Sequence, residues 1–253
     1  MHDHVLARLR TSVVHRDRGS VDQARTAGRL FAGDFTAATT AGEEFEGSRL
    51  GLGVMHDLDG EVVSIHGRTW RVPVDGIPVA VGAAEGIAFG IAAHGGREHR
   101  LRLAADLDVE GILAAIDAYL ERTHVDHEQV VCGVEIDGTF EDVVLRTVAP
   151  PTHDGETLGE IIDEETRFTF PSWDGTLVGF RFPDASSGVT IPGLHLHALS
   201  RDLGSGGHLR NATTRSVTAR IWVDDLHPVA DSGSADSDSD DATDFRRLEG
   251  PVH

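Results

Sequence analysis

Residues 175–208 read GTLVGFRFPDASSGVTIPGLHLHALSRDLGSGGH, and the prediction of the fold starts from this stretch. It holds two strand-like runs around a middle that is rich in Gly, Pro and Ser, which are turn residues. His195 and His197 stand two apart on the second run, so both side chains point to the same face of a strand. The segment 201–207 is rich in turn residues, and His208 begins the next strand. A hairpin can therefore bring His208 opposite the pair.

Three imidazoles that converge from adjacent strands are typical of an open zinc site, in which further positions remain for water or substrate. The alternative is a polar strand face whose histidines hydrogen-bond to their neighbours. Since the chain holds 15 histidines, the residues alone leave both interpretations open. The other groups lie in an arm, at a turn or after a helix end, and we expect none of them to bind a metal: His2 with His4, His94 with His99, and His124 with His127 and Glu128.

Strand signals outnumber helix signals in the rest of the chain. One amphipathic helix is predicted over 109–122, with Asp108 as its N-cap. A short helix is predicted to begin at Ser20, with Gln23 three residues later as in a capping box, and to end near Gly33. The predicted strands span 49–55, 61–66, 69–74, 77–81, 86–93, 99–104, 167–170, 177–182, 193–200 and 216–223.

A hairpin is predicted from the segments 130–136 and 140–147, with a turn at Asp137 and Gly138. Because strands dominate and do not alternate regularly with helices, the order favours an α+β fold over a doubly wound α/β sheet. We expect a β-rich domain of mixed sheets with few helices, in which strands build the metal site.

The composition limits the class of partner. The 253 residues suit one large domain or two closely packed halves, and they carry 42 acidic against 22 basic residues, for a formal net charge of -20. Nucleic acid is excluded as a partner, because neutralising phosphates needs a cationic face. All the basic residues are arginines. We favour adaptation to high salt, which screens repulsion among carboxylates, over an ordinary acidic protein with an acidic tail.

No apolar run is long enough to span a membrane and no signal-peptide pattern is present, so we expect no membrane partner. Cys132 is the only cysteine, so no intrachain disulfide can form and a cytoplasmic location is the default. The acidic segment 231–244 has no large apolar residue and is predicted to be disordered. Its Asp-x-Asp spacing is similar to a calcium loop, but the required Gly and Glu are missing, so no calcium is expected there.

Three upstream blocks accompany the histidine stretch: LFAGDF at 30–35, GLGVMHDLDGEVV at 51–63 and VEIDGTFEDVVLRTV at 134–148. Together with the Gly-Thr-x-Val-Gly-Phe-Arg, Pro-Gly-x-His-x-His and Gly-Gly-His motifs of 175–208, they resemble the alpha-acetolactate decarboxylase family. The resemblance covers residues 20–223, with the blocks in the family's order. It implies metal-dependent decarboxylation of 2-acetolactate to acetoin and CO2 by a homodimer.

The resemblance also implies site residues. The family's metal ligands are the histidines of the two C-terminal motifs, which correspond to His195, His197 and His208, and Zn2+ or another divalent transition metal is the implied cofactor. The glutamate of the Leu-Asp-Gly-Glu motif, which lies in the family's active site, corresponds to Glu61. The arginine of the Val-x-x-Arg-Thr-Val block corresponds to Arg146. Without the resemblance, Glu61 is an ordinary residue after a turn and Arg146 a surface charge on a strand.

The sequence departs from the family at Val54, where members usually have a Thr whose hydroxyl faces the active site; valine keeps the shape and loses that hydrogen bond. The family also brings a glutamate near the C-terminus into its active site, and Glu249 is the candidate because it is the only acidic side chain after the acidic segment. The expected domains are an N-terminal arm over 1–19, an acetolactate decarboxylase-like catalytic domain over 20–226, an acidic disordered linker over 227–244, and a tail over 245–253 that docks at the active site.

Two other functions remain open at this point. One is a metal-dependent enzyme that acts on another small 2-hydroxy or 2-oxo acid, which Val54 keeps open. The other is a metal-binding or sensory module without catalysis; Glu61 and Arg146 argue against it, since a metal holder needs neither. The sequence has neither a GxGxxG motif nor a P-loop, so the expected partner is a small-molecule substrate without an organic cofactor.

Overall fold

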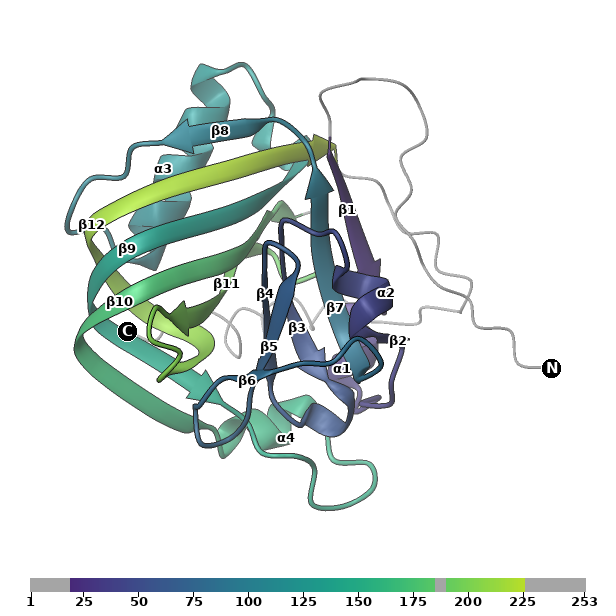
Figure 1. The fold of residues 1–253 in the computed structure, drawn as a ribbon. Helices are drawn as coiled ribbons and strands as arrows, with labels where there is room; N and C mark the ends of the chain where they lie inside the picture. Colours follow the sequence, from purple (N-terminus) through teal and green to yellow (C-terminus); the bar gives the residue numbers. More distant parts are fainter. Residues whose placement is uncertain (1–18, 185–189, 226–253) are drawn as a thin grey trace.

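Two antiparallel β-sheets face each other across a shared core (Figure 1). The computed structural model describes residues 19–184 and 190–225. The first sheet has the order β1-β7-β3-β4-β5-β6, with β2 paired to β7. Its strands are β1 (Gly19–Ala24), β2 (Thr39–Thr40), β3 (Leu50–Met55), β4 (Glu61–Ile65), β5 (Arg68–Val72), β6 (Val79–Ala80) and β7 (Gly86–Gly95).

The second sheet has the order β11-β10-β9-β12-β8, and β11 also pairs with β12. The strands β9, β10, β11 and β12 therefore form a closed ring of hydrogen-bonded neighbours, in which residues 197–199 of β11 pair with β12. In Figure 1, β9, β10 and β12 are long, strongly curved ribbons. The strands of this sheet are β8 (Glu98–Leu101), β9 (Val130–Thr147), β10 (Thr166–Phe182), β11 (Gly193–Ser200) and β12 (Gly206–Asp225).

The second sheet is buried on both faces. On β11, Leu196 and Ala198 belong to the apolar cluster around helix α3, whereas Leu199 belongs to the cluster between the two sheets. Because side chains alternate between the faces of a strand, His195 and His197 point with Leu199 into the space between the sheets. The fold thus places the histidines in the interior.

Helix α3 (Val109–Arg122) covers the other face of the second sheet and matches the prediction at both ends. Val109, Ile112, Ile116 and Leu120 are buried at three- and four-residue steps, and the carboxylate of Asp108 accepts a hydrogen bond from the backbone N–H of Gly111. The α+β class is confirmed, as are the predicted strands of the first sheet to within two residues at most ends. The expected mixed sheets differ from the structure, because all pairings in the described ranges are antiparallel.

The helix predicted from Ser20 is wrong. Residues Gly19–Ala24 form strand β1, which pairs with β7 along its whole length, and the helix α1 (Ala27–Phe31) begins only after Thr26. The pattern Ser-x-x-Gln satisfied the capping-box rule locally, but pairing with a long buried strand overrode that local preference.

The hairpin predicted around Asp137 and Gly138 is also wrong, because β9 runs through both residues without a turn. Asp137 pairs with Thr176 on one side and Thr218 on the other. Gly138 has φ 147°, and a Cβ there would lie 2.1 Å from the backbone oxygen of Ser216. The Asp-Gly dipeptide serves close approach between strands rather than chain reversal.

Two short helices were not predicted, although each carries a sequence signal. In α2 (Ala41–Phe45), Thr40 and Glu43 form a complete capping box, and in α4 (Leu158–Asp163), Thr157 and Glu160 do the same. Both follow the pattern Thr-x-x-Glu. Two 3-10 turns complete the elements, η1 (His56–Leu58) and η2 (His127–Gln129).

The predicted arm, apart from Gly19 in β1, lies outside the described residues, as do the acidic linker 227–244, the tail 245–253 and Glu249. Among the described helices, none combines the length and the apolar character needed to cross a membrane.

Candidate metal centre

The strand register of the second sheet places three of the predicted site residues in one cross-strand row. His197 on β11 pairs with His208 on β12, and His208 pairs in turn with Arg146 on β9. Residues directly opposite each other in antiparallel strands point to the same face. The structure therefore brings His208 opposite the His-x-His pair, as expected, and adds Arg146 from a strand that is distant in sequence.

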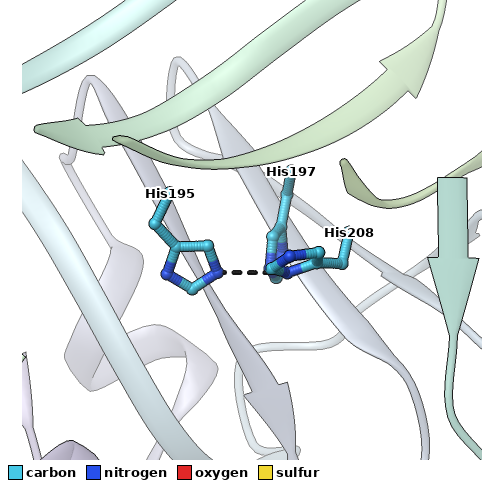
Figure 2. A group of neighbouring side chains, drawn as sticks. All are labelled: His195, His197 and His208. Carbon is cyan, nitrogen blue, oxygen red and sulfur yellow. Dashed lines mark hydrogen bonds between the residues drawn. The ribbon is translucent and has the colours of Figure 1, made fainter. Parts of the chain in front are cut away.

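The three imidazoles face one another from β11 and β12 (Figure 2). Nε2 of His195 lies 3.2 Å from Nδ1 of His208, and one ring nitrogen from each residue lies within 4.8 Å of the others. All three side chains are buried, with His197 and His208 each 1% exposed. Within the ranges 19–184 and 190–225, this is the one group of three or more potential ligands close enough to share an ion.

A backbone carbonyl fixes the protonation of His197. Its Nδ1 lies 2.8 Å from the carbonyl oxygen of Val62 on β4, and because a carbonyl only accepts, Nδ1 carries the proton. The lone pair of His197 therefore resides on Nε2. Outer hydrogen bonds of this kind hold ligating histidines in the right tautomer and orientation.

Burial keeps the triad neutral. Loss of solvation lowers the pKa of His197 to about 3, with the charge of Arg146 adding to the effect. Burial also lowers the pKa values of His195 and His208 well below 6.5, and again Arg146 acts in the same direction. Neutral imidazole is the form that binds a metal, so the triad holds its ligand form without deprotonation.

The donor set fits a divalent transition metal. Nδ1 of His195 is buried and has no hydrogen-bond partner among the described residues, and buried polar nitrogens are normally satisfied by some partner. Three neutral nitrogens in a water-poor site suit zinc and its neighbours better than calcium or magnesium, which prefer oxygen ligands.

Glu61 reaches the triad from the opposite sheet. It begins β4, pairs with Val54 on β3, and its side chain is 3% exposed. Oε1 accepts a hydrogen bond of 3.2 Å from Nη1 of Arg146, whose side chain is also 3% exposed. Oε2 lies 3.6 Å from Nε2 of His197. The interpretation of Arg146 as a surface charge is thereby excluded, and one carboxylate contacts both the cation and the triad.

A strained turn sets the position of Glu61. Asp57 and Leu58 have φ of 55° and 52°, in the left-handed region that side chains other than Gly and Asn rarely adopt. Leu58 is fully buried, and the N–H of Met55 donates to the carbonyl of Gly60 across the turn. Burial of Leu58 thus offsets a backbone strain of about 1–3 kcal/mol. It also fixes Leu58 itself, which lies three residues before Glu61.

Apolar side chains complete the cavity around these groups. Val54 lines it, as expected, and is 8% exposed. The remaining apolar lining was not predicted from the sequence, although Leu30 and Val148 lie in two of the quoted blocks and Ile191 lies in the stretch 175–208. Its members are Leu30, Phe89, Val148, Leu158 and Ile191. The cavity therefore combines one polar corner with apolar walls.

The sequence matches a known protein family over most of its length. The family model, described as alpha-acetolactate decarboxylase, matches residues 21–228. The alpha-acetolactate decarboxylase of Methylococcus capsulatus is 29% identical over 209 residues, which cover 83% of this chain and 78% of that protein. That of Klebsiella aerogenes is 27% identical over 180 residues, covering 71% and 67%.

A solved structure supports the fold. The crystal structure of alpha-acetolactate decarboxylase from Bacillus subtilis strain 168 superposes with a TM-score of 0.77 and covers 91% of this chain and 99% of that one. At 23% sequence identity, this similarity establishes the shared fold. The profile match spans the strands that carry the histidines, Arg146 and Glu61.

Proposed function

The chain belongs to the alpha-acetolactate decarboxylase family, and from that premise we propose that it converts 2-acetolactate into acetoin and CO2 with a metal ion held by His195, His197 and His208. One observation carries the proposal for the site. The buried triad, Arg146 and Glu61 meet in a single cavity, although they come from two different sheets.

Loss of CO2 leaves an electron pair on the substrate, and a metal bound to three neutral histidines would act as a Lewis acid toward the negative charge that results. Arg146 supports the same charge from the side. Its planar guanidinium offers several N–H donors, one of which is bonded to Glu61, and it suits a carboxylate or a negatively charged oxygen.

Glu61 is proposed to move protons. It lies within 3.6 Å of the triad and is held by Arg146, so its carboxylate is positioned at the reacting end of the cavity. A carboxylate there can accept the proton of the substrate hydroxyl and return one to the carbon that loses CO2. Because Glu61 projects from one side only, proton return from one face produces a single enantiomer of acetoin.

The apolar walls have their own role in this proposal. Leu30, Phe89 and Ile191 leave little room for water, which strengthens electrostatic interactions in the cavity. They also match the two methyl groups of acetolactate. A small 2-hydroxy-3-oxo acid is therefore the substrate class that fits both the polar corner and the walls.

Finer properties are part of the same proposal. We propose zinc as the metal, Glu249 as a second acid in the site, the segment 20–226 as the catalytic domain, and a homodimer in the cytoplasm. The net charge of -20, in a chain whose basic residues are all arginines, favours function at high salt, where repulsion among carboxylates is screened.

Two alternatives lead to different outcomes. A related 2-hydroxy or 2-oxo acid becomes the better substrate if Val54, which lines the cavity, selects against acetolactate. A non-catalytic metal-binding module needs neither Glu61 nor Arg146, yet both are buried at 2% exposure. A buried ion pair is weak evidence for stability, because desolvation offsets the attraction between its charges, and both groups line the cavity beside the triad, so the enzyme is favoured.

The test is acetoin release from racemic 2-acetolactate by the purified protein in molar salt. We expect product that disappears after chelation and returns on addition of zinc. Folded, metal-loaded protein that converts a related 2-hydroxy-3-oxo acid and not acetolactate would shift the assignment to that substrate. Metal content without turnover of any member of such a panel would favour the module.

A further inference from the structure

We propose that Glu165, a residue outside the predicted site, is a positioning residue that holds the guanidinium of Arg146 in its catalytic orientation through Nε. Oε2 of Glu165 lies 3.5 Å from Nε of Arg146, and the Glu165 side chain is 5% exposed. This inference rests on the proposed function of Arg146 and extends it to a residue that does not touch the cavity.

The contacts of Arg146 suggest how the positioning works. A guanidinium is planar, and its donors have fixed directions. Nη1 is bonded to Glu61 from the first sheet, while Nε lies 3.5 Å from Oε2 of Glu165, an ion-pair contact in which neither atom makes a hydrogen bond to any described residue. A hydrogen bond at one nitrogen and an ion pair at another restrict rotation about the bonds of the side chain. Arg146 itself lines the cavity, so its orientation decides how the guanidinium meets a bound substrate.

The backbone that carries Glu165 is itself fixed. Its N–H donates to the carbonyl of Ile162 at the end of α4, and the next residue, Thr166, begins β10. Thr166 pairs with Thr147 and Arg167 with Arg146, so Glu165 follows the same register as the arginine it contacts. The backbone therefore holds Glu165 at a fixed place beside the strand that carries Arg146.

An exposed arginine, Arg167, balances the charge of Glu165. Its Oε1 accepts a hydrogen bond from Nε of Arg167, whose side chain is 52% exposed. The charges therefore alternate along the series Glu61, Arg146, Glu165 and Arg167. Because Arg167 already pairs with Oε1, the other oxygen remains available to Arg146, and we infer that this contact shortens when substrate binds, as catalytic contacts often do.

Two variants separate the effect of the length of the Glu165 side chain from the effect of its charge. Glu165→Gln keeps an oxygen at the same distance from Nε but removes the charge. Glu165→Asp keeps the charge but withdraws the oxygen by one methylene. If Glu165 acts by holding Nε, we expect Glu165→Gln to retain kcat within about threefold and Glu165→Asp to lose about tenfold or more, with KM changed less than kcat, since small misplacements are costly in catalysis. Glu164→Asp, the same change at the exposed neighbouring residue, is the control and should behave as the parent protein.

A second readout does not depend on activity. We expect the Nε–H resonance of Arg146, assigned by its loss in Arg146→Lys, to exchange slowly with water in the parent and in Glu165→Gln, and rapidly in Glu165→Asp, once zinc and acetoin are bound. Equal kcat in Glu165→Asp and the parent, or equal damage in both Glu165 variants, would overturn the positioning role. Protected resonances in a protein that does not decarboxylate acetolactate would uphold that role and refute the proposed function instead.

Discussion

The two sheets contribute to the site in different ways. The second sheet supplies the three histidines and Arg146 from strands that are joined by backbone hydrogen bonds in a closed ring. The first sheet supplies Glu61 and Val54, whose distance from the triad depends on how side chains pack between the sheets. The comparison teaches that the histidine triad is set by strand register, whereas the placement of Glu61, the proposed proton-handling group, is set by packing and by hydrogen bonds between the sheets.

The largest effect is expected when one of the three histidines of the proposed metal site is replaced. His208→Gln should abolish stoichiometric metal binding and reduce turnover by at least about a thousandfold, because Lewis-acid stabilisation contributes several kcal/mol. Metal content by mass spectrometry and acetoin release measure both. His94→Gln, at a partly exposed residue near Asp22, is the control and should retain its metal. Full metal content in His208→Gln would remove this residue from the ligand set.

The next effect tests the first sheet. Glu61→Gln should keep one metal per chain and lower kcat by at least about a hundredfold, since removal of a general acid–base typically costs that much or more. Glu46→Gln, an exposed glutamate, should leave kcat unchanged. Undiminished turnover in Glu61→Gln would show that the first sheet does not handle the proton.

Acid should destabilise the metal-free protein. The pKa of His197 is about 3 in the folded state and 6.5 is its ordinary value, so between these pH values the unfolded chain binds more protons. The free energy of unfolding therefore falls as the pH is lowered from 6.5 toward 3, by about 1.4 kcal/mol per pH unit for each such histidine. Urea unfolding across this window measures the slope. His197→Gln should have the shallower slope; an unchanged slope would contradict the neutral, buried state.

The smallest effect concerns Val54. Val54→Thr should keep its metal and lower KM for 2-acetolactate by up to about tenfold, because one hydrogen bond gained in a buried site contributes roughly 1 kcal/mol. Steady-state kinetics with each enantiomer measure it. A KM that does not change with either enantiomer would mean that this wall does not contact the reacting groups.

The sequence predicted the placement of the three histidines well, because its signals there are local. His195 and His197 are two apart on a strand, and a turn-rich segment before His208 implies a hairpin, as the pairing of His197 with His208 confirms. Helix α3 was predictable for the same reason, since its apolar period and its cap at Asp108 lie within one continuous segment.

Contacts between distant segments were not predictable from local patterns. The strands of Arg146 and His208 are paired across 62 residues of sequence, and only the resemblance to a family indicated that Arg146 belongs to the site. The helix expected at Ser20 and the turn expected at Gly138 both failed where a long strand imposed its own pairing. Glu165 carried no signal at all, because its role depends on the register between β9 and β10.

The most direct measurement is a titration of the chelated protein with zinc, in which bound metal and acetoin release are followed together. We expect turnover to rise in proportion to bound zinc and to reach its plateau at one ion per chain in the parent, while Glu61→Gln binds the same ion without the rise. Turnover that is independent of bound zinc, or a plateau reached without occupancy of the His195, His197 and His208 site, would contradict the assignment of this triad as the catalytic metal centre.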